Sequence, residues 1–335
     1  MEENYPDEWL KNLPAQSEDI AFKPEEMIQC AKCARANPPT RLNCFYCGAE
    51  LEIGDEQRQF LKLNLRKLEA WEKGFNLIFS PATQFAVEIN AARISRLLKS
   101  ETEFTDKILR SETPLPIARA ASEPEAETLK TQLREAGVET LIIGDENLKI
   151  EKPPHRLRGI EFFDDKLILI LFNQDEIVEI ANEDLAVIIT GATFERKIEA
   201  TEKYNKEGKN KILETSETAS DERLIDIYSR NDSIGYRIWA KGFDFSCLEN
   251  EKGILATENI KKLAGKLRRI DPNVKLIDDY LQVRDKLSAV WEVEQKVDSQ
   301  GLKREGFGKF NLGNLTTVNN LSQFTRYSRL QWHLL

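Results

Sequence analysis

The stretch Cys30-Ala-Lys-Cys33-Ala-Arg-Ala-Asn37-Pro-Pro-Thr-Arg41-Leu-Asn-Cys44-Phe-Tyr-Cys47-Gly48 holds four of the five cysteines in a chain of 335 residues. Each cysteine pair encloses two residues and ten residues separate the pairs, a spacing that lets four thiolates turn back on one metal ion. The pattern therefore predicts one structural Zn²⁺ with no open position for water. Two disulfides are the alternative, but nothing in the sequence indicates an oxidising compartment. The expected ligands are Cys30, Cys33, Cys44 and Cys47.

Small residues follow both cysteine pairs. Gly48 comes after the last cysteine and Ala34 holds the equivalent place after Cys33, so that backbone N–H groups can face the sulfurs. Asn37-Pro38-Pro39 supplies the turn that carries the chain from one pair to the other. We expect residues 29–53 to form a zinc ribbon.

The pattern Cys, two residues, Cys, three residues, Asn, six residues, Cys, two residues, Cys, Gly resembles the short bacterial and archaeal zinc-ribbon modules that precede many regulatory domains. Its spacing is also similar to that of the RanBP2-type zinc finger, a family with single-stranded RNA readers and ubiquitin binders. Asn37 and Arg41 match the RNA readers, whereas Ile28 and Pro39 stand where those proteins carry Trp and a loop aromatic. Ala34-Arg35 replaces the Thr-Phe of the ubiquitin binders. The resemblance implies zinc binding and leaves the partner open.

The same module carries a candidate binding surface. No acidic residue lies between Cys30 and Ala49, so the basic side chains there would form a small positive patch. An aromatic side chain beside such a patch can stack on a nucleic-acid base. The candidate partner-binding residues are Lys32, Arg35, Asn37, Arg41, Phe45 and Tyr46.

Composition limits the classes of function. The net charge of -9 argues against a protein that mainly coats nucleic acid or an anionic membrane. The N-terminus lacks the basic and apolar regions of a secretory signal. The longest apolar run, Leu167 to Phe172, is far shorter than the roughly 20 residues that span a bilayer. We expect a soluble, cytoplasmic protein without a transmembrane segment.

The segments around the module are acidic or rich in helix formers. Residues 1–28 are acidic and aperiodic, which predicts a flexible lead. Residues 55–111 predict a helical segment with two helices, Asp55 to Gly74 and Pro81 to about Arg110. Their apolar faces would pack on each other or on the next domain, and a coiled-coil dimerisation segment is the alternative.

Residues 112–150 predict a small βαβ unit. Leu115 to Ala120 reads as a strand, Ser122 with Glu125 forms a capping box, Gly137 ends the helix and Val138 to Ile143 is the second strand. The stretch from Leu115 to Gly144 resembles the small bacterial domain labelled as a signal-transducing protein, a resemblance that implies a fold and no defined activity.

Residues 155–270 predict a β-rich domain. We expect a loop from Thr215 to Asp221 and, after Gly253, a helix with Ile260, Leu263 and Leu267 on one face. Antiparallel strands followed by one amphipathic helix match the plan of a pleckstrin-homology-like barrel, an interpretation that rests on element order alone. The expected strands are 157–163, 167–172, 177–180, 186–190, 194–204, 224–228 and 236–240.

Residues 271–335 predict a helix that opens at Asp278-Asp279, then a Gly- and Asn-rich stretch, then an aromatic tail. Because the tail carries Phe324, Tyr327, Leu330 and Trp332, we expect it to dock on a neighbouring module or on a partner.

The fold class that follows is an α+β multidomain chain with an N-terminal zinc ribbon, a helical linker, a βαβ unit, a β-rich domain and C-terminal helices. The sequence leaves open the oligomeric state, and whether 112–150 shares a core with 155–270. We found no catalytic motif, and neither His155 nor His333 has the setting of a general base. We therefore expect a non-catalytic adaptor or regulatory protein that binds a protein partner. The alternative is a factor that binds single-stranded RNA or DNA through the ribbon.

Overall fold

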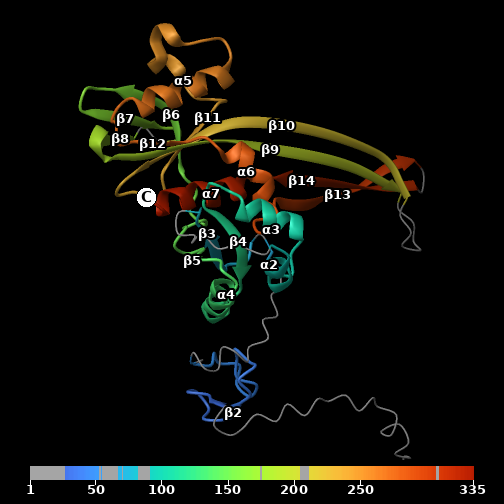
Figure 1. Cartoon of the computed structure of the whole chain (residues 1–335). Helices are drawn as coiled ribbons and strands as arrows, with labels where there is room; N and C mark the ends of the chain where they lie inside the picture. Colours follow the sequence, from blue (N-terminus) through green and yellow to red (C-terminus); the bar gives the residue numbers. More distant parts are fainter. Residues whose placement is uncertain are drawn as a thin grey trace, which may run out of the picture. The chain divides into compact units, whose positions relative to one another are not determined.

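The computed structural model describes residues 27–52, 54, 67–69, 71–81, 91–173, 176–203, 211–306 and 309–335 (Figure 1). The chain divides into two compact units, residues 1–64 and 65–335, which we treat separately. Almost all of the acidic lead expected at 1–28 and most of the helix expected from Asp55 lie outside the described residues.

The first unit contains a four-cysteine module, residues 27–52. Strands β1 (Ile28–Gln29) and β2 (Ala36–Asn37) pair antiparallel. Its buried cluster consists of Ile28, Leu51 and two of the cysteines. A core of this size cannot offset the conformational entropy of folding, so the module needs a further constraint such as a metal ion.

The first sheet of the second unit has three strands. Strand β3 (Phe75–Phe79) lies between β4 (Leu115–Ala120) and β5 (Thr140–Gly144) and runs antiparallel to both. Strand β3 lies between the two helices expected within 55–111 and was not predicted, and the described residues 67–69 and 71–74, expected as the end of the first helix, are not helical. A buried run of five residues, four of them apolar, is too short for its periodicity to separate a strand from a helix.

Local capping chemistry sets the helices of this region. In α4 (Glu123–Glu135), the Glu125 N–H donates to Ser122 Oγ at 3.4 Å and the Glu125 carboxylate accepts from the Ala121 N–H at 2.8 Å. Gly137 ends the helix with φ at +87°. The expected strand–helix–strand order is therefore present. The helix expected up to Arg110 contains α2 (Ala91–Leu98) and α3 (Thr102–Leu109).

The second sheet is large and curled. Its strand order is β13-β14-β9-β10-β11-β6-β7-β8, and β12 (Lys275–Ile277) pairs with β9 beside that path. The pair between β11 and β6 is parallel and the order is open, which differs from the antiparallel strands expected of a barrel. Six strands of this sheet follow one another in the chain: β6 (His155–Phe162), β7 (Lys166–Leu171), β8 (Ile177–Ala181), β9 (Leu185–Lys203), β10 (Lys211–Ser229) and β11 (Tyr236–Trp239). Short 3-10 helices lie at Asn182–Asp184 and Phe245–Glu251.

The two longest strands correct a second expectation. The stretch from Thr215 to Asp221, predicted as a loop, lies within β10 and pairs residue by residue with β9. Likewise, the two short strands expected at 186–190 and 194–204 form the single strand β9. Side chains from Thr215 to Asp221 are exposed, so the stretch lacks the alternation of a half-buried strand and resembles a loop in sequence.

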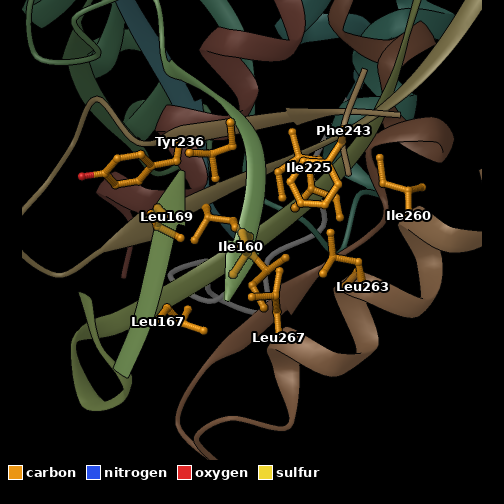
Figure 2. Packing of buried hydrophobic residues seen from close by; sticks show 14 of the residues in the cluster. Ile160, Leu167, Leu169, Ile225, Tyr236, Phe243, Ile260, Leu263 and Leu267 are labelled. Atoms are coloured by element: carbon orange, nitrogen blue, oxygen red, sulfur yellow. The ribbon is translucent and has the colours of Figure 1, made fainter. Parts of the chain in front are cut away.

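Helices cover both faces of the middle of the large sheet. Figure 2 shows Ile260, Leu263 and Leu267 of α5 (Ala256–Arg268) against Ile160 and Ile225 of the sheet, as the helical spacing predicted. The opposite face of β9 carries α7 (Leu321–His333), which lies between the two sheets in Figure 1. Central strands buried on both faces account for the continuous apolar run from Leu185 to Ile189.

The C-terminal segment is more regular than its composition indicates. After α6 (Tyr280–Leu287), residues expected to be an irregular Gly- and Asn-rich stretch form the hairpin of β13 (Glu294–Gly306) and β14 (Lys309–Asn319). The aromatic tail forms α7, in which Phe324, Tyr327 and Leu330 are fully buried within the same chain. No helix among the described residues is long and apolar enough to cross a membrane.

Candidate metal centre

Two knuckles with the same backbone pattern hold the four cysteines. In each, the N–H of the first cysteine donates to the carbonyl five residues on, at 3.0 Å from Cys30 and 2.7 Å from Cys44. The residue after the second cysteine donates its N–H to the carbonyl of the first, at 2.8 Å in the first knuckle and 2.9 Å in the second. The repeated pattern turns both pairs of thiols toward one point.

The last residue of each knuckle has a left-handed backbone. Ala34 has φ at +57° and Gly48 at +71°. The left-handed region costs an L-residue roughly 1–2 kcal/mol, a cost that glycine does not carry. The first knuckle therefore contains a strained residue and the second does not.

Gly48→Ala is expected to weaken metal binding by about five- to thirty-fold, because a Cβ at Gly48 meets no atom within 4 Å and only the backbone strain of about 1–2 kcal/mol is added. Ala34→Gly, its counterpart in the other knuckle, is expected to bind as tightly as wild type or more tightly. Competition against a chromophoric chelator measures both affinities. Gly48→Ala with unchanged affinity would contradict the role of this backbone conformation.

The sulfur atoms fit a tetrahedral ion. All four Sγ atoms lie within 4.8 Å of one another. Cys30 Sγ is 3.6 Å from Cys47 Sγ, and Cys33 Sγ is 3.5 Å from Cys44 Sγ. A tetrahedral ion with bonds of about 2.3 Å needs roughly 3.8 Å between its sulfur ligands, so the cluster could hold one ion with little rearrangement.

Asn37 links the two knuckles. Its amide nitrogen donates to the Arg35 carbonyl at 2.8 Å and to Cys44 Sγ at 3.5 Å, and its amide oxygen accepts from the Phe45 N–H at 2.8 Å. The side chain is fully buried. Asn37, expected among the partner-binding residues, is therefore held between the two knuckles and is not exposed to a partner.

The thiols differ in acidity before any ion binds. Burial raises the pKa of Cys44, but the N–H groups of Tyr46 and Cys47 outweigh it and bring that pKa to about 6. The Arg35 N–H lowers the pKa of Cys33, yet burial and the neighbouring thiols raise it to about 12. The lowered pKa of Cys44 favours its thiolate, which is the form that ligates a cation, and a thiol that ligates a cation releases its proton.

An exposed strip of aromatic and basic side chains lies on the module. Phe45 and Tyr46 are 67% and 53% exposed, and their rings meet edge to face with centroids 5.5 Å apart. The Arg35 guanidinium lies 4.7 Å from the Tyr46 centroid, and that of Arg41 lies 4.9 Å from the Phe45 centroid. Lys32 is exposed as well. The structure thus joins four of the six predicted residues through ring contacts, and we call these four, with the exposed Lys32 of the same module, the aromatic–basic strip.

Sequence reasoning missed two exposed apolar residues on β13 of the second unit. Val297 is 60% exposed and Leu302 is 57% exposed. The alternation of Lys296, Val297 and Asp298 was a strand signal, but the glycines that follow concealed it.

Comparison with models of known protein families, with curated proteins and with solved structures finds no match for this chain. The resemblance of the cysteine pattern to zinc ribbons, and that of residues 115–144 to a bacterial signalling domain, therefore rest on the sequence motifs alone.

Proposed function

We propose that the chain is a non-catalytic adaptor in which a zinc ribbon binds a protein partner through the aromatic–basic strip. The observation that carries the proposal is the exposure of Phe45 and Tyr46 beside the metal site. Tyr, Phe and Arg are enriched in protein interfaces, and the aromatic rings give a large contact area while few torsions are immobilised. A module with so small a core gains a rigid surface of this kind from one bound ion.

The donor set supports Zn²⁺ as that ion. Four thiolates in a tetrahedral arrangement suit zinc or an iron–sulfur site and disfavour the hard cations that prefer oxygen. Four protein ligands leave no position for water, which makes the ion structural in this proposal. None of the five cysteines, all within described residues, forms a disulfide, in keeping with the reducing cytoplasm in which we place the protein.

The chemistry of the strip favours an acidic partner. Lys32, Arg35 and Arg41 are positive, and the sequence between Cys30 and Ala49 has no compensating carboxylate. A protein segment with Asp or Glu beside an apolar anchor would pair with the guanidinium groups and cover the two rings.

Single-stranded nucleic acid is the second candidate, because arginine and aromatic side chains also bind phosphates and bases. Salt dependence separates the two candidates. Each phosphate contact adds a slope of about -0.7 to the dependence of log affinity on log salt for single strands. The affinity of a protein interface centred on buried aromatic rings depends much less on salt concentration.

Affinity purification from the native cells tests the proposal, with and without nuclease. We compare wild type with Phe45→Ala/Tyr46→Ala, which leaves all four cysteines in place, and with Phe163→Ala, which removes an exposed aromatic ring from the second unit. A protein that survives nuclease, stays with Phe163→Ala and is lost with the double variant supports the adaptor. Co-purification that disappears with nuclease supports the nucleic-acid candidate. Identical protein sets from wild type and the double variant would refute the strip as the binding site.

A further inference from the structure

Strand β13 is a free edge of the large sheet. It begins the strand order, and within the described residues its one partner strand is β14. All residues from Glu294 to Leu302 are exposed. Within the described residues, the straight part of this edge, from Glu294 to Ser299, can offer backbone donors and acceptors to a strand that matches it.

The edge also stands clear of the helices. Strands β9, β10, β14 and β13 extend together beyond the helices that cover the middle of the sheet (Figure 1). The register places Val297 beside Thr316 of β14, which in turn lies beside Ile198 of β9. Opposed residues share a face of the sheet, so Val297 is the outermost and most exposed member of a row that continues through the half-buried Thr316 and Ile198.

The two charged residues next to Val297 can pair with the same two residues of a second copy of the strand. Lys296 and Asp298 flank Val297, and their side chains form an exposed ion pair at 3.1 Å within the strand. If a second β13 runs antiparallel with Val297 opposite Val297, each Lys296 lies opposite the other copy's Asp298. Two opposite-charge pairs then form about one two-fold axis, as an isologous interface requires.

Neighbouring registers are less favourable. Centring the pair on Lys296 opposes two ammonium groups and puts Glu294 opposite Asp298, and centring it on Asp298 opposes two carboxylates. The bulge between Ser299 and Gly301 ends the straight part of the strand. The part of β13 before the bulge is therefore one short segment that can pair with a second strand. Of the registers compared, the one that places Val297 opposite Val297 avoids opposing like charges.

We propose that β13 pairs with β13 of a second copy of this chain, antiparallel and in register about Val297, to make a dimer with a continuous sheet. The occupant is a second copy because the edge carries both members of the charge pair that recognises it. This inference is independent of the function proposed for the four-cysteine module. Since so short a strand pair is small beside a standard interface, the dimer is weak and depends on concentration.

Sedimentation of the full chain over a wide range of concentration tests the charge pairing. Wild type is expected to shift toward twice its monomer mass, and Lys296→Asp to lose at least tenfold in association because carboxylates then face each other. The exchange Lys296→Asp/Asp298→Lys restores self-association but not association with labelled wild type, since mixed pairs oppose like charges. A wild type that stays monomeric, or a Lys296→Asp variant that associates equally well, would overturn the proposal.

Cross-linking tests the register. Opposed residues in antiparallel strands have Cβ atoms about 4.5–5.5 Å apart, close to disulfide geometry. Val297→Cys is therefore expected to form a covalent dimer on mild oxidation. Leu302→Cys, on the same strand with similar exposure, lies too far from its counterpart. Equal cross-linking of the two variants would rule out the register at Val297.

Discussion

Replacing Cys44 and Cys47 by serine is expected to lower bound zinc from one ion per chain to near none and to unfold the four-cysteine module. The reason is the small core of this module, in which Ile28 and Leu51 pack with two of the ligands themselves. Structural zinc supplies roughly 10–16 kcal/mol of apparent binding energy in zinc-finger peptides, and this binding energy is also their folding energy. Elemental analysis gives the metal content, and hydrogen exchange gives the loss of protection over residues 27–52.

The second unit is expected to remain folded in this variant, because residues 65–335 form a separate compact unit. Cys247→Ser is the matched control, since Cys247 is half-buried within the second unit and outside the cluster. The control should retain one zinc per chain. Full zinc content in Cys44→Ser/Cys47→Ser would refute the assignment of four thiolate ligands.

The cluster of four cysteines could be predicted because its information is local. Thiol spacing and the small residues after each pair lie within twenty residues, and the structure places all four sulfurs together. The buried position of Asn37 could not be predicted, because it depends on how the second knuckle packs against the first. Burial of this side chain was visible only after Cys44 and Phe45 were placed around it.

The fold could be predicted where side chains act on their own backbone. The Ser122 cap and the Gly137 stop set α4 from nearby sequence. The hairpin of β13 and β14 was missed because its glycines and asparagines favour loops on local grounds. Besides the pairing with β13, pairing with β9, more than a hundred residues earlier in the chain, supplies backbone partners that keep β14 extended.

The burial of charged side chains in α7 could not be predicted from the sequence either. Its aromatic residues predicted docking, but Arg326 and Arg329 are also buried. Arg329 donates to the carbonyl of Leu148 at 3.1 Å, and Arg326 lies 3.7 Å from the carboxylate of Asp145. Helix α7 thus joins the small sheet to the large one through buried charge as well as through apolar packing. Residues 112–150 and 155–270 are therefore linked through α7.

Asp145→Ala is expected to destabilise the second unit by about 3–5 kcal/mol, the usual effect of removing one member of a buried ion pair. The buried carboxylate accepts from the Gly74 N–H and the Asn76 amide, each at 3.0 Å, and from the Arg119 guanidinium. Without it, the two buried cations Arg119 and Arg326 lose the carboxylate that lies between them. Urea denaturation of the full chain gives the midpoint and the free energy of unfolding.

Asp285→Ala is the control for this measurement, because the Asp285 side chain is 93% exposed and its ion pair with Arg284 has an N–O distance of 3.7 Å. An exposed carboxylate of this kind changes the free energy of unfolding by no more than about 0.5 kcal/mol. Since Asp145 bonds to residues before β3, within β3 and within β4, its loss should also lower hydrogen-exchange protection in all three strands of the small sheet. Equal unfolding midpoints for the two variants would show that the buried charge contributes nothing to the union of the two sheets.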